Sequence, residues 1–487
     1  MKDFSIPNVF LLLLLLLLLG SCGSLFVMHC NGQEEALSVA PMEEKEKEAL
    51  YLAIQGFVGK WWNGSDLYPD PCGWTPIQGV FCDLHEGLWY ISDINIGPIY
   101  DNSLICSPNA AFSHHLFNLN RLKSLSIFNC FTNPNQNPVT ISTLNWTKFT
   151  NTLESLEFRS NPGLIGTIPT TIGSLRELQS LVLLENGLSG KLPLEIGNLA
   201  NLKKLVLSGN QLVGQVPESF GFLTQLLIFD SSRNKLSGPL PWTIGGLVSL
   251  LKLDLSSNVL EGNIPEDIGK LKNLTLLDLG NNKLSGGLAQ KIQEMVSLKE
   301  LVMSNNLIGG DLDRIQWANM RNLEILDLSN TALEGKIPES ILALKGIRYL
   351  GLDNNNLSGN IPTNLESMSN IRTIYINGNN LTGELGFSEE FYRKFGRRFG
   401  AWNNPNLCFR EDLVSASFVP FGVKPCKQEH GVFSNGDSNA KISSSERNWN
   451  GDSQVVNSLG FASYGFDFWD VFGVQGTFVF LLWNLLF

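Results

Sequence analysis

Charged residues and histidines are scarce in this chain of 487 residues, and the motifs of the common enzyme classes are missing. Only 17% of the residues are charged and only five are histidine. There is no glycine-rich phosphate loop, no HRD or DFG motif, no GxSxG and no HExxH. None of the eight cysteines forms a CxxC pair, which argues against a zinc site. The sequence therefore predicts no enzymatic activity, no catalytic residue, no cofactor and no metal site.

Basic residues are outnumbered by acidic ones, which gives a formal net charge of −11. A negative surface repels phosphate and uronate groups, so nucleic acid and polyanionic pectin are not expected as main partners. The alternative interpretation is that this charge only keeps the protein soluble.

The strongest signal in the sequence is an internal repeat. Residues 247–265 (LVSLLKLDLSSNVLEGNIP) follow the pattern LxxLxxLxLxxNxLxGxIP. Ten clear repeats run from about Thr150 to Leu385, spaced mostly by 24 or 25 residues, and a degenerate one covers Leu119 to Asn129. The asparagine of the pattern stands at 161, 186, 210, 234, 258, 282, 306, 355 and 379, and Thr331 takes the one missing place.

Each position of the repeat has a physical reading. The two leucines of LxL point to the same side of a short strand, and strands of successive repeats stack into a parallel sheet. The asparagine amide can both donate and accept, so it can satisfy backbone groups of neighbouring turns. Thr331 can replace only part of that bonding. If each repeat is called a rung of the solenoid, the rung of Thr331 is predicted to be weakly bonded to its neighbours. The glycine allows a bend, and the proline after it stops further pairing. The predicted fold is an α/β repeat solenoid.

The two ends of the chain carry export and attachment signals. Residues 1–32 are typical of a signal peptide, with a leucine run from Val9 to Leu19 and cleavage after Gly32; a signal anchor is the alternative. Val471 to Phe487 is apolar but short for a membrane span. We expect a glycolipid-anchor signal with attachment at Ser458 or Gly460. A marginal membrane span, or a tail with neither role, are the alternatives.

Six cysteines remain after export, an even number that suits an oxidising compartment. Six cysteines allow 15 connectivities, and proximity along a linear repeat fold favours pairing between neighbours. The predicted disulfides are Cys72–Cys82, Cys106–Cys130 and Cys408–Cys426. The predicted N-glycosylation sites are Asn63, Asn145, Asn273, Asn356 and Asn380.

The segments that flank the repeats read as covers for the ends of the array. Glu44 to Trp62 has helical apolar spacing, and Ser388 to Phe399 reads as a short basic helix. The predicted domains are a signal peptide (1–32), an N-terminal cap region (33–118), leucine-rich repeats (119–385), a C-terminal cap (386–426), a disordered stalk (427–457) and the anchor signal or apolar tail (458–487).

These motifs resemble those of the plant extracellular leucine-rich-repeat receptor-like proteins. The resemblance rests on DPCGWTPIQGVFC before the array, on LxGxIP elements such as LEGNIP, and on Asn404-Pro405-Asn406-Leu407-Cys408 after it. In overall layout the chain is similar to the Piriformospora indica-insensitive protein 2 type. The resemblance implies a curved horseshoe with the parallel sheet on its concave face and disulfide-bonded caps. It also implies recognition of ligands, microbes or co-receptors at the cell surface or cell wall.

Departures from the common Asp and Ser residues of the sheet mark candidate ligand contacts. Val182, Leu184 and Val206 form an apolar group near the start of the array, and Tyr349, Asp353, Tyr375 and Asn377 form an aromatic and polar group near its end. Surface drift is the alternative explanation for both groups.

Three functions are compatible with the sequence. The first is a cell-surface receptor-like protein with a protein or peptide ligand, a membrane receptor kinase as partner, and membrane contact through the C-terminal tail. The second is a soluble inhibitor of a microbial wall-degrading enzyme, and the third is a structural wall protein. The apolar tail favours the first, on the outer face of the plasma membrane or in the cell wall.

Overall fold

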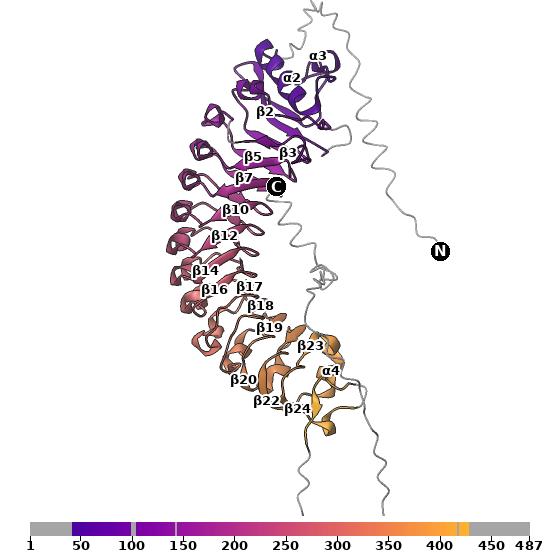
Figure 1. Cartoon of the computed structure of the whole chain (residues 1–487), viewed down its shortest axis with the longest axis vertical. Coiled ribbons are helices and arrows are strands. Elements are labelled where there is room, and N and C mark those ends of the chain that lie inside the picture. Colours follow the sequence, from indigo (N-terminus) through magenta and orange to yellow (C-terminus); the bar gives the residue numbers. More distant parts are fainter. Residues whose placement is uncertain (1–40, 99–103, 142–143, 416–417, 428–487) are drawn as a thin grey trace, which may run out of the picture. The chain divides into compact units, whose positions relative to one another are not determined.

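One 14-stranded sheet runs along the repeat array and lies on its concave side (Figure 1). The computed structural model describes residues 41–98, 104–141, 144–415 and 418–427. β1 and β2 form an antiparallel hairpin, and each later strand pairs in parallel with the strand before it. The strands are β1 (Val80–His85), β2 (Leu88–Ile96), β3 (Ser124–Phe128), β5 (Ser155–Arg159), β7 (Ser180–Leu184), β9 (Lys204–Val206), β11 (Ile228–Asp230), β13 (Lys252–Asp254), β15 (Leu276–Asp278), β17 (Glu300–Val302), β18 (Ile325–Asp327), β19 (Tyr349–Gly351), β21 (Thr373–Tyr375) and β23 (Phe399–Gly400).

A second row of parallel strands, which the repeat pattern did not predict, forms mostly at the LxG segments of the repeats. It consists of a seven-stranded and a four-stranded sheet. The first contains β4 (Val139–Thr140), β6 (Leu164–Thr167), β8 (Gly187–Lys191), β10 (Gln211–Gly214), β12 (Lys235–Gly238), β14 (Val259–Asn263) and β16 (Lys283–Ser285). The second contains β20 (Ser358–Asn360), β22 (Asn380–Leu385), β24 (Asn406–Phe409) and β25 (Lys424–Pro425). Single bridges alone span the interval between them, at Ser285↔Leu307, Asp311↔Glu334 and Lys336↔Ser358.

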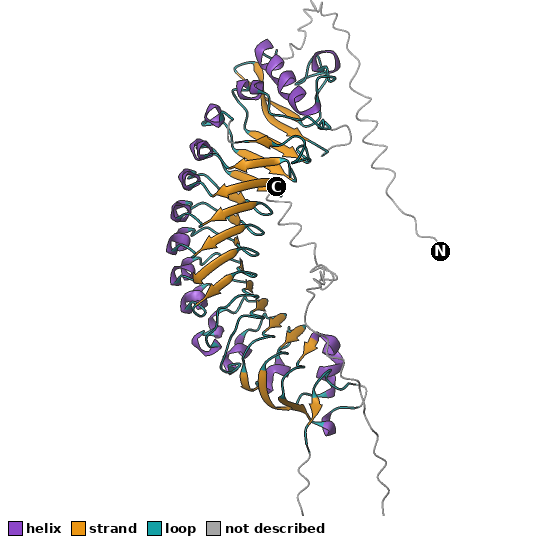
Figure 2. Ribbon diagram, in the orientation of Figure 1, coloured by secondary structure: helices purple, strands orange, loops and turns teal. Residues whose placement is uncertain are grey.

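Short 3₁₀-helices return the chain along the convex side (Figure 2). Many follow directly on the proline of the repeat, whose fixed φ suits the residue before a helical turn. They are η1 (His114–Asn118), η2 (Trp146–Phe149), η3 (Thr170–Ser174), η4 (Leu194–Asn198), η5 (Glu218–Phe222), η6 (Trp242–Gly246), η7 (Glu266–Lys270), η8 (Gln290–Glu294), η9 (Leu312–Arg314), η10 (Trp317–Asn319), η11 (Glu339–Ala343), η12 (Thr363–Ser367), η13 (Gly396–Arg398) and η14 (Glu411–Leu413).

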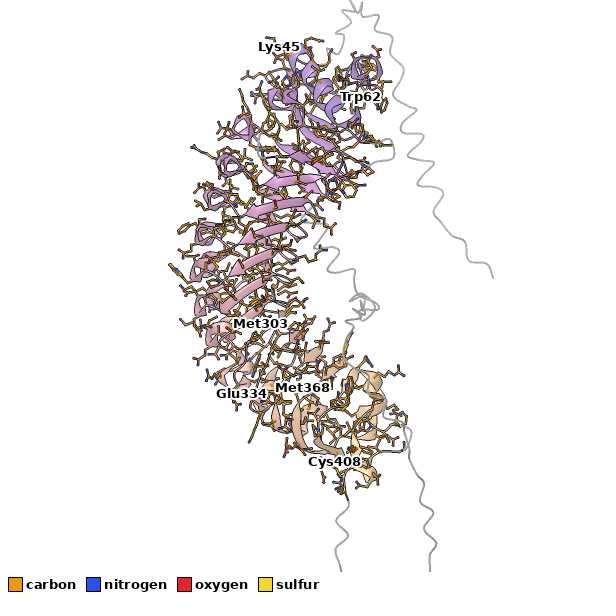
Figure 3. The ribbon with its side chains drawn as sticks, in the orientation of Figure 1. Lys45, Trp62, Met303, Glu334, Met368 and Cys408 are labelled. Carbon is orange, nitrogen blue, oxygen red and sulfur yellow. A yellow bond between two sulfur atoms is a disulfide. The ribbon has the colours of Figure 1, made fainter. Side chains whose placement is uncertain are left out.

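The core is a continuous stack of aliphatic side chains between the sheet and the convex turns. Leu253 and Leu255 of one LxL pair are both fully buried, and Ile268 of the following helix meets them from the other side. Met303, labelled in Figure 3, takes the place of a second leucine and is also fully buried. The expected solenoid with a concave parallel sheet is therefore confirmed.

The repeat asparagines of successive rungs, which we call the asparagine ladder, both donate and accept hydrogen bonds as predicted. Asn258 donates through Nδ2 to the carbonyls of Ser231, Leu255 and Ser256, at 2.9, 3.1 and 3.2 Å. Its Oδ1 accepts from the backbone N–H of Leu236 at 2.9 Å. One buried amide thus satisfies four backbone groups on its own rung and the rung before it.

Thr331 interrupts the ladder as predicted. Its hydroxyl donates to the carbonyl of Leu328 at 2.6 Å and to Oδ1 of Asn355 at 3.1 Å. In the part of the chain that the structure describes, this side chain makes no hydrogen bond to the rung before it. The interruption lies in the same interval where the second row of strands is reduced to single bridges.

The N-terminal cap is built on α2 (Glu44–Val58), within the predicted helical segment, and α3 (Gly64–Leu67) follows it. Leu50, Ile54 and Phe57 of α2 are fully buried against the first strands. The disulfide Cys72–Cys82 closes this cap, and Cys408–Cys426 closes the other, so the expected disulfide-bonded caps are present. Cys408 is labelled in Figure 3.

The sheet continues beyond Leu385, where the sequence pattern placed its last repeat. α4 (Glu389–Phe395) leads into β23, and Asn404 then takes the ladder position. Its Nδ2 donates to the carbonyl of Ile376 at 3.0 Å, and its Oδ1 accepts from Leu381 N–H at 3.0 Å. The first part of the predicted cap is therefore one more rung.

The predicted signal peptide, stalk and anchor segment lie outside the described residues. Within the described ranges, no helix is long and apolar enough to cross a membrane.

Candidate ligand-binding surface

The concave sheet presents one outward side chain between the two core residues of each strand. Neighbouring strands lie about 4.8 Å apart, so these side chains form a closely spaced column. From β11 onward the column reads, in register, Asp230, Asp254, Asp278, Val302, Asp327, Gly351, Tyr375 and Gly400.

The repeated Asp and Ser residues form hydrogen bonds with one another within the same repeat. Asp230 Oδ1 accepts from the N–H of Ser232 at 3.1 Å and from its hydroxyl at 2.8 Å. The same pair of bonds joins Asp254 to Ser256 and Asp327 to Ser329. This local pairing is a physical reason for the recurrence of Asp and Ser. Positions that carry another residue type are therefore the better candidates for ligand contacts.

The first group of predicted contacts is only partly available to a ligand. Val182, in register with Glu157 and Val206, is 1% exposed although it lies on the concave sheet. Leu184 and Val206 are half-buried. On the neighbouring strand Arg159 and Glu157 form an ion pair of 2.7 Å. Val182 is therefore covered despite its place in the concave column, which the column pattern could not reveal.

The middle of the column is acidic and contains one bridging cation. Lys252 Nζ lies 3.0 Å from Asp230 and 3.4 Å from Asp254. Burial, and then the neighbouring Asp254, raise the pKa of Asp278 to about 7. Burial and the nearby Glu324 also raise the pKa of Glu300. This stretch of the sheet therefore holds more negative charge than its own cations balance.

The second group of predicted contacts comes together on β19, β21 and the residues that follow them. The rings of Tyr349 and Tyr375 lie 6.1 Å apart in an edge-to-face arrangement. Burial raises the pKa of Tyr349, and the carboxylates of Asp327 and Asp353 raise it further. Burial, together with Asp327, likewise raises the pKa of Asp353. Asn377 is only 7% exposed, and its Oδ1 has no hydrogen-bond partner among the described residues.

Two glycines shape this region and were not among the predicted contacts. A Cβ on Gly351 would lie 2.8 Å from Asp327 Oδ1 and 2.9 Å from Tyr349 Cε1. A Cβ on Gly400 would lie 2.6 Å from Asn377 Oδ1 and 2.7 Å from Tyr375 Cδ1. Gly351 could have been found as a break in the acidic column. Gly400 belongs to the additional rung, which the repeat pattern did not reach.

A hollow of about 500 Å³ lies where the first strands begin, and Asp83, Tyr90, Arg121, Lys123 and Glu154 are among its lining residues. Arg121 stacks over the ring of Tyr90, with 5.0 Å from its Cζ to the centroid, and Lys123 pairs with Asp83 at 2.6 Å. Both charges of that ion pair are about half exposed, so the pair contributes little stability.

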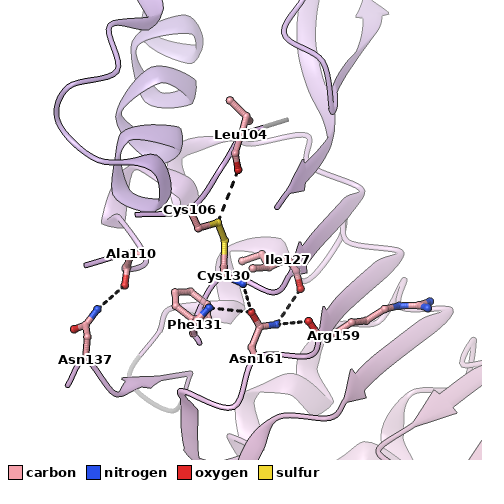
Figure 4. The surroundings of a disulfide bond; sticks show 9 residues. All are labelled: Leu104, Cys106, Ala110, Ile127, Cys130, Phe131, Asn137, Arg159 and Asn161. Carbon is pink, nitrogen blue, oxygen red and sulfur yellow. Dashed lines mark hydrogen bonds between the residues drawn. A yellow bond between two sulfur atoms is a disulfide. The ribbon is translucent and has the colours of Figure 1, made fainter. Parts of the chain in front are cut away.

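The third disulfide lies between the cap and the first repeats. Cys106 is joined to Cys130, and Asn161 Oδ1 accepts from the N–H groups of Cys130 and Phe131 at 2.8 and 3.1 Å (Figure 4). The first ladder asparagine therefore fixes the segment that carries this bond.

The five asparagines of the predicted glycosylation sites are all exposed: Asn63, Asn145, Asn273, Asn356 and Asn380.

Within the described ranges, no three or more His, Cys, Asp or Glu side chains come together in a way that could hold a metal ion.

Comparisons with known proteins agree with this architecture. The leucine-rich-repeat family model matches residues 201–223, 249–271, 273–295, 322–344 and 346–368. The chain is 58% identical over 163 residues to Piriformospora indica-insensitive protein 2 of Arabidopsis thaliana, a match that covers 32% of this chain and 38% of that protein. The match thus spans well under half the length of that curated relative.

Two solved structures are similar in fold. One is the ectodomain of the Arabidopsis thaliana membrane receptor kinase GASSHO1/SCHENGEN3 in complex with CASPARIAN STRIP INTEGRITY FACTOR 2, with 27% identity, a TM-score of 0.62, and coverage of 75% of this chain and 41% of that one. The other is the ectodomain of the Arabidopsis receptor kinase HAESA with an IDA peptide hormone ligand, with 29% identity, a TM-score of 0.55, and coverage of 75% and 62%.

Proposed function

We propose that this chain is a plant leucine-rich-repeat receptor-like protein, which binds a peptide or protein ligand along its concave sheet and acts through a partner receptor kinase. The proposed role is recognition without catalysis, on the outer face of the plasma membrane or in the cell wall.

The observation that carries this proposal is the arrangement of the concave sheet. Parallel strands at regular spacing give an extended row of side chains. Near its end Tyr375 interrupts the column of repeated Asp residues, and the ring of Tyr349 from the neighbouring strand lies beside it. Partly buried tyrosines beside polar groups are typical of binding hot spots. The GASSHO1/SCHENGEN3 and HAESA ectodomains were each solved with a bound ligand, and we extend that mode of use to this chain.

The finer parts of the proposal rest on the sequence. We propose export through the signal peptide, glycosylation of the five exposed sequon asparagines, and a glycolipid anchor at Ser458 or Gly460. The 58% identical relative is named for insensitivity to Piriformospora indica, and from that name we extend a role in the response to microbes.

The test is proximity labelling on intact root cells, with the labelling enzyme inserted between the predicted cleavage site after Gly32 and Glu44. Asp254→Asn creates an Asn-Leu-Ser glycosylation sequon in the middle of the concave sheet. Ala200→Thr creates an Asn-Leu-Thr sequon at the exposed Asn198 on the convex side, and serves as the matched control. Labelling of a receptor kinase should be lost with the concave glycan and retained with the convex one.

Phosphatidylinositol-specific phospholipase C supplies the control for attachment, because it should release the labelling enzyme from the cells. Equal loss of the kinase with both glycans would show that the concave sheet is not the contact surface. Full-length protein found only in the medium, with a microbial wall-degrading enzyme as its labelled neighbour, would replace this proposal with the soluble-inhibitor function.

A further inference from the structure

Five side chains at the end of the concave sheet form what we call the tyrosine–carboxylate box: Asp327, Tyr349, Asp353, Tyr375 and Asn377. Gly351 and Gly400 lie on either side of Tyr375 in the same column. Over Gly351 the carboxylate of Asp327 meets the ring of Tyr349, and over Gly400 the amide oxygen of Asn377 meets the ring of Tyr375. Each glycine thus gives an oxygen acceptor and an aromatic ring room to lie side by side.

The acceptors of this box are not matched by cations. In the described ranges neither Asp327 nor Asp353 takes part in an ion pair, whereas Asp230 and Asp254 share Lys252. Asp327 Oδ1 receives both bonds from Ser329, and Asp353 Oδ2 receives the neutral amide of Asn354 at 2.7 Å. A buried acceptor without a donor is costly, so the partnerless Oδ1 of Asn377 also favours an incoming N–H group.

The chemistry of the box selects among possible occupants. An anion would meet two carboxylates and the electron-rich faces of two rings, so it is excluded. A metal ion is disfavoured because the described acidic and histidine side chains do not converge as metal ligands anywhere. A planar guanidinium carries several N–H donors and stacks on aromatic rings, which suits acceptors and tyrosines together.

The basic side chain of Arg398 does not fill this place. Burial, and then Asp353, raise the pKa of Tyr375, and the nearby Arg398 opposes that rise. The Nη2 of Arg398 donates to the carbonyl of Lys394 at 2.7 Å, and the residue is exposed. Its guanidinium is therefore held by the end of α4.

We propose that the tyrosine–carboxylate box binds an arginine side chain of the polypeptide ligand, held by Asp327, Asp353 and Asn377 between the rings of Tyr349 and Tyr375. This inference rests on the proposed function, because it names the ligand residue that the end of the concave sheet recognises.

The test uses N-acetyl-arginine amide as the probe, and N-acetyl-citrulline amide as its neutral counterpart of nearly the same shape. Binding to the intact secreted protein is followed by NMR of labelled tyrosine rings. The arginine probe should shift the signals of Tyr349 and Tyr375, assigned through single Tyr→Phe variants, and the citrulline probe should not. Asp353→Asn should weaken binding about tenfold, as expected when a charged hydrogen-bond partner is lost.

Asp278→Asn is the matched control, because Asp278 is a partly buried concave carboxylate outside the box. It should leave the affinity for the arginine probe unchanged. Equal binding of the two probes, no tyrosine shifts, or equal weakening by both variants would each overturn the inference. The thermal unfolding midpoint of each variant verifies that it is folded.

The two proposals can fail separately. If the arginine probe binds the box but no receptor kinase is labelled on cells, the inference stands and the proposed function fails. If the kinase is labelled but the arginine probe does not bind, the proposed function stands and the inference is wrong.

Discussion

The rung of Asn258 and the rung of Thr331 occupy the same place in the repeat but differ in how they connect to their neighbours. The amide of Asn258 bonds to the rung before it at both its nitrogen and its oxygen. Among the residues that the structure describes, the hydroxyl of Thr331 bonds only to its own rung and to Asn355 of the next. The second row of strands is continuous beside the first rung and reduced to single bridges beside the second.

This difference shows that the core and the polar ladder are separate sources of stability. Leu326 and Leu328 near Thr331 are as fully buried as Leu253 and Leu255 near Asn258. The apolar stack is therefore continuous through the weak rung. Backbone bonds such as Gly309 N–H to the carbonyl of Thr331, at 2.8 Å, also remain, and among the described residues only the side-chain bonds from position 331 to the preceding rung are missing. In a repeat fold each rung contacts mainly its neighbours, so such a defect lowers stability locally.

The largest expected effect comes from giving a regular rung the chemistry of the weak one. Asn258→Thr should destabilise the protein by about 3 kcal/mol, because the buried N–H of Leu236 loses its acceptor and the carbonyl of Ser231 keeps only the longer of its two amide bonds, the one from Asn234. Urea unfolding of the secreted protein measures this change. A loss of stability below about 0.5 kcal/mol would mean that the asparagine ladder contributes little, and that the different hydrogen bonds of the two rungs do not make them differ in stability.

The second effect is electrostatic. Because regular rungs repeat the same residue at the same position, Asp254 lies beside Asp278 on the neighbouring strand, and the two carboxylates repel each other. In the unfolded chain Asp278 loses its proton near its ordinary pKa of 3.8, whereas in the folded protein burial and Asp254 raise its pKa to about 7. The folded state thus holds this proton longer, and the stability contributed by this group falls as the pH rises from about 4 to 7.

Asp278→Asn should therefore stabilise the protein at pH 8 by roughly 1–3 kcal/mol, and should change nothing at pH 3.5. Thermal unfolding at the two pH values measures the difference. A gain of the same size at both would assign the effect to packing rather than to charge.

The smallest effect comes from repairing the weak rung. Thr331→Asn supplies an amide that can reach the preceding rung, and should stabilise the protein by about 1 kcal/mol. Hydrogen exchange at the N–H of Ile308 should slow in this variant, while exchange at Leu236 stays the same. Faster exchange at Ile308 would show that the backbone spacing of this rung does not admit the amide.

Much of this architecture could be predicted because the spacing of the repeat fixes which residues of successive rungs lie side by side. The LxL leucines, the ladder asparagines and the two cap disulfides follow from spacing and from the rule that an end rung needs a cover. The second row of strands could not be predicted, because the LxG element indicates a bend but does not show whether the backbones of neighbouring rungs pair there. The rung of Asn404 was missed because α4 breaks the repeat pattern before it.

The candidate surface divides in the same way. The sequence by itself determined which positions face the concave side, since alternation along a strand fixes the direction of each side chain. Only the tertiary structure decided which of them a ligand can reach. It buried Val182, and it placed Gly400 of the next rung against both Tyr375 and Asn377. The physical reason is that exposure and charge balance depend on neighbours about 25 residues away in the chain, through packing that no single repeat contains.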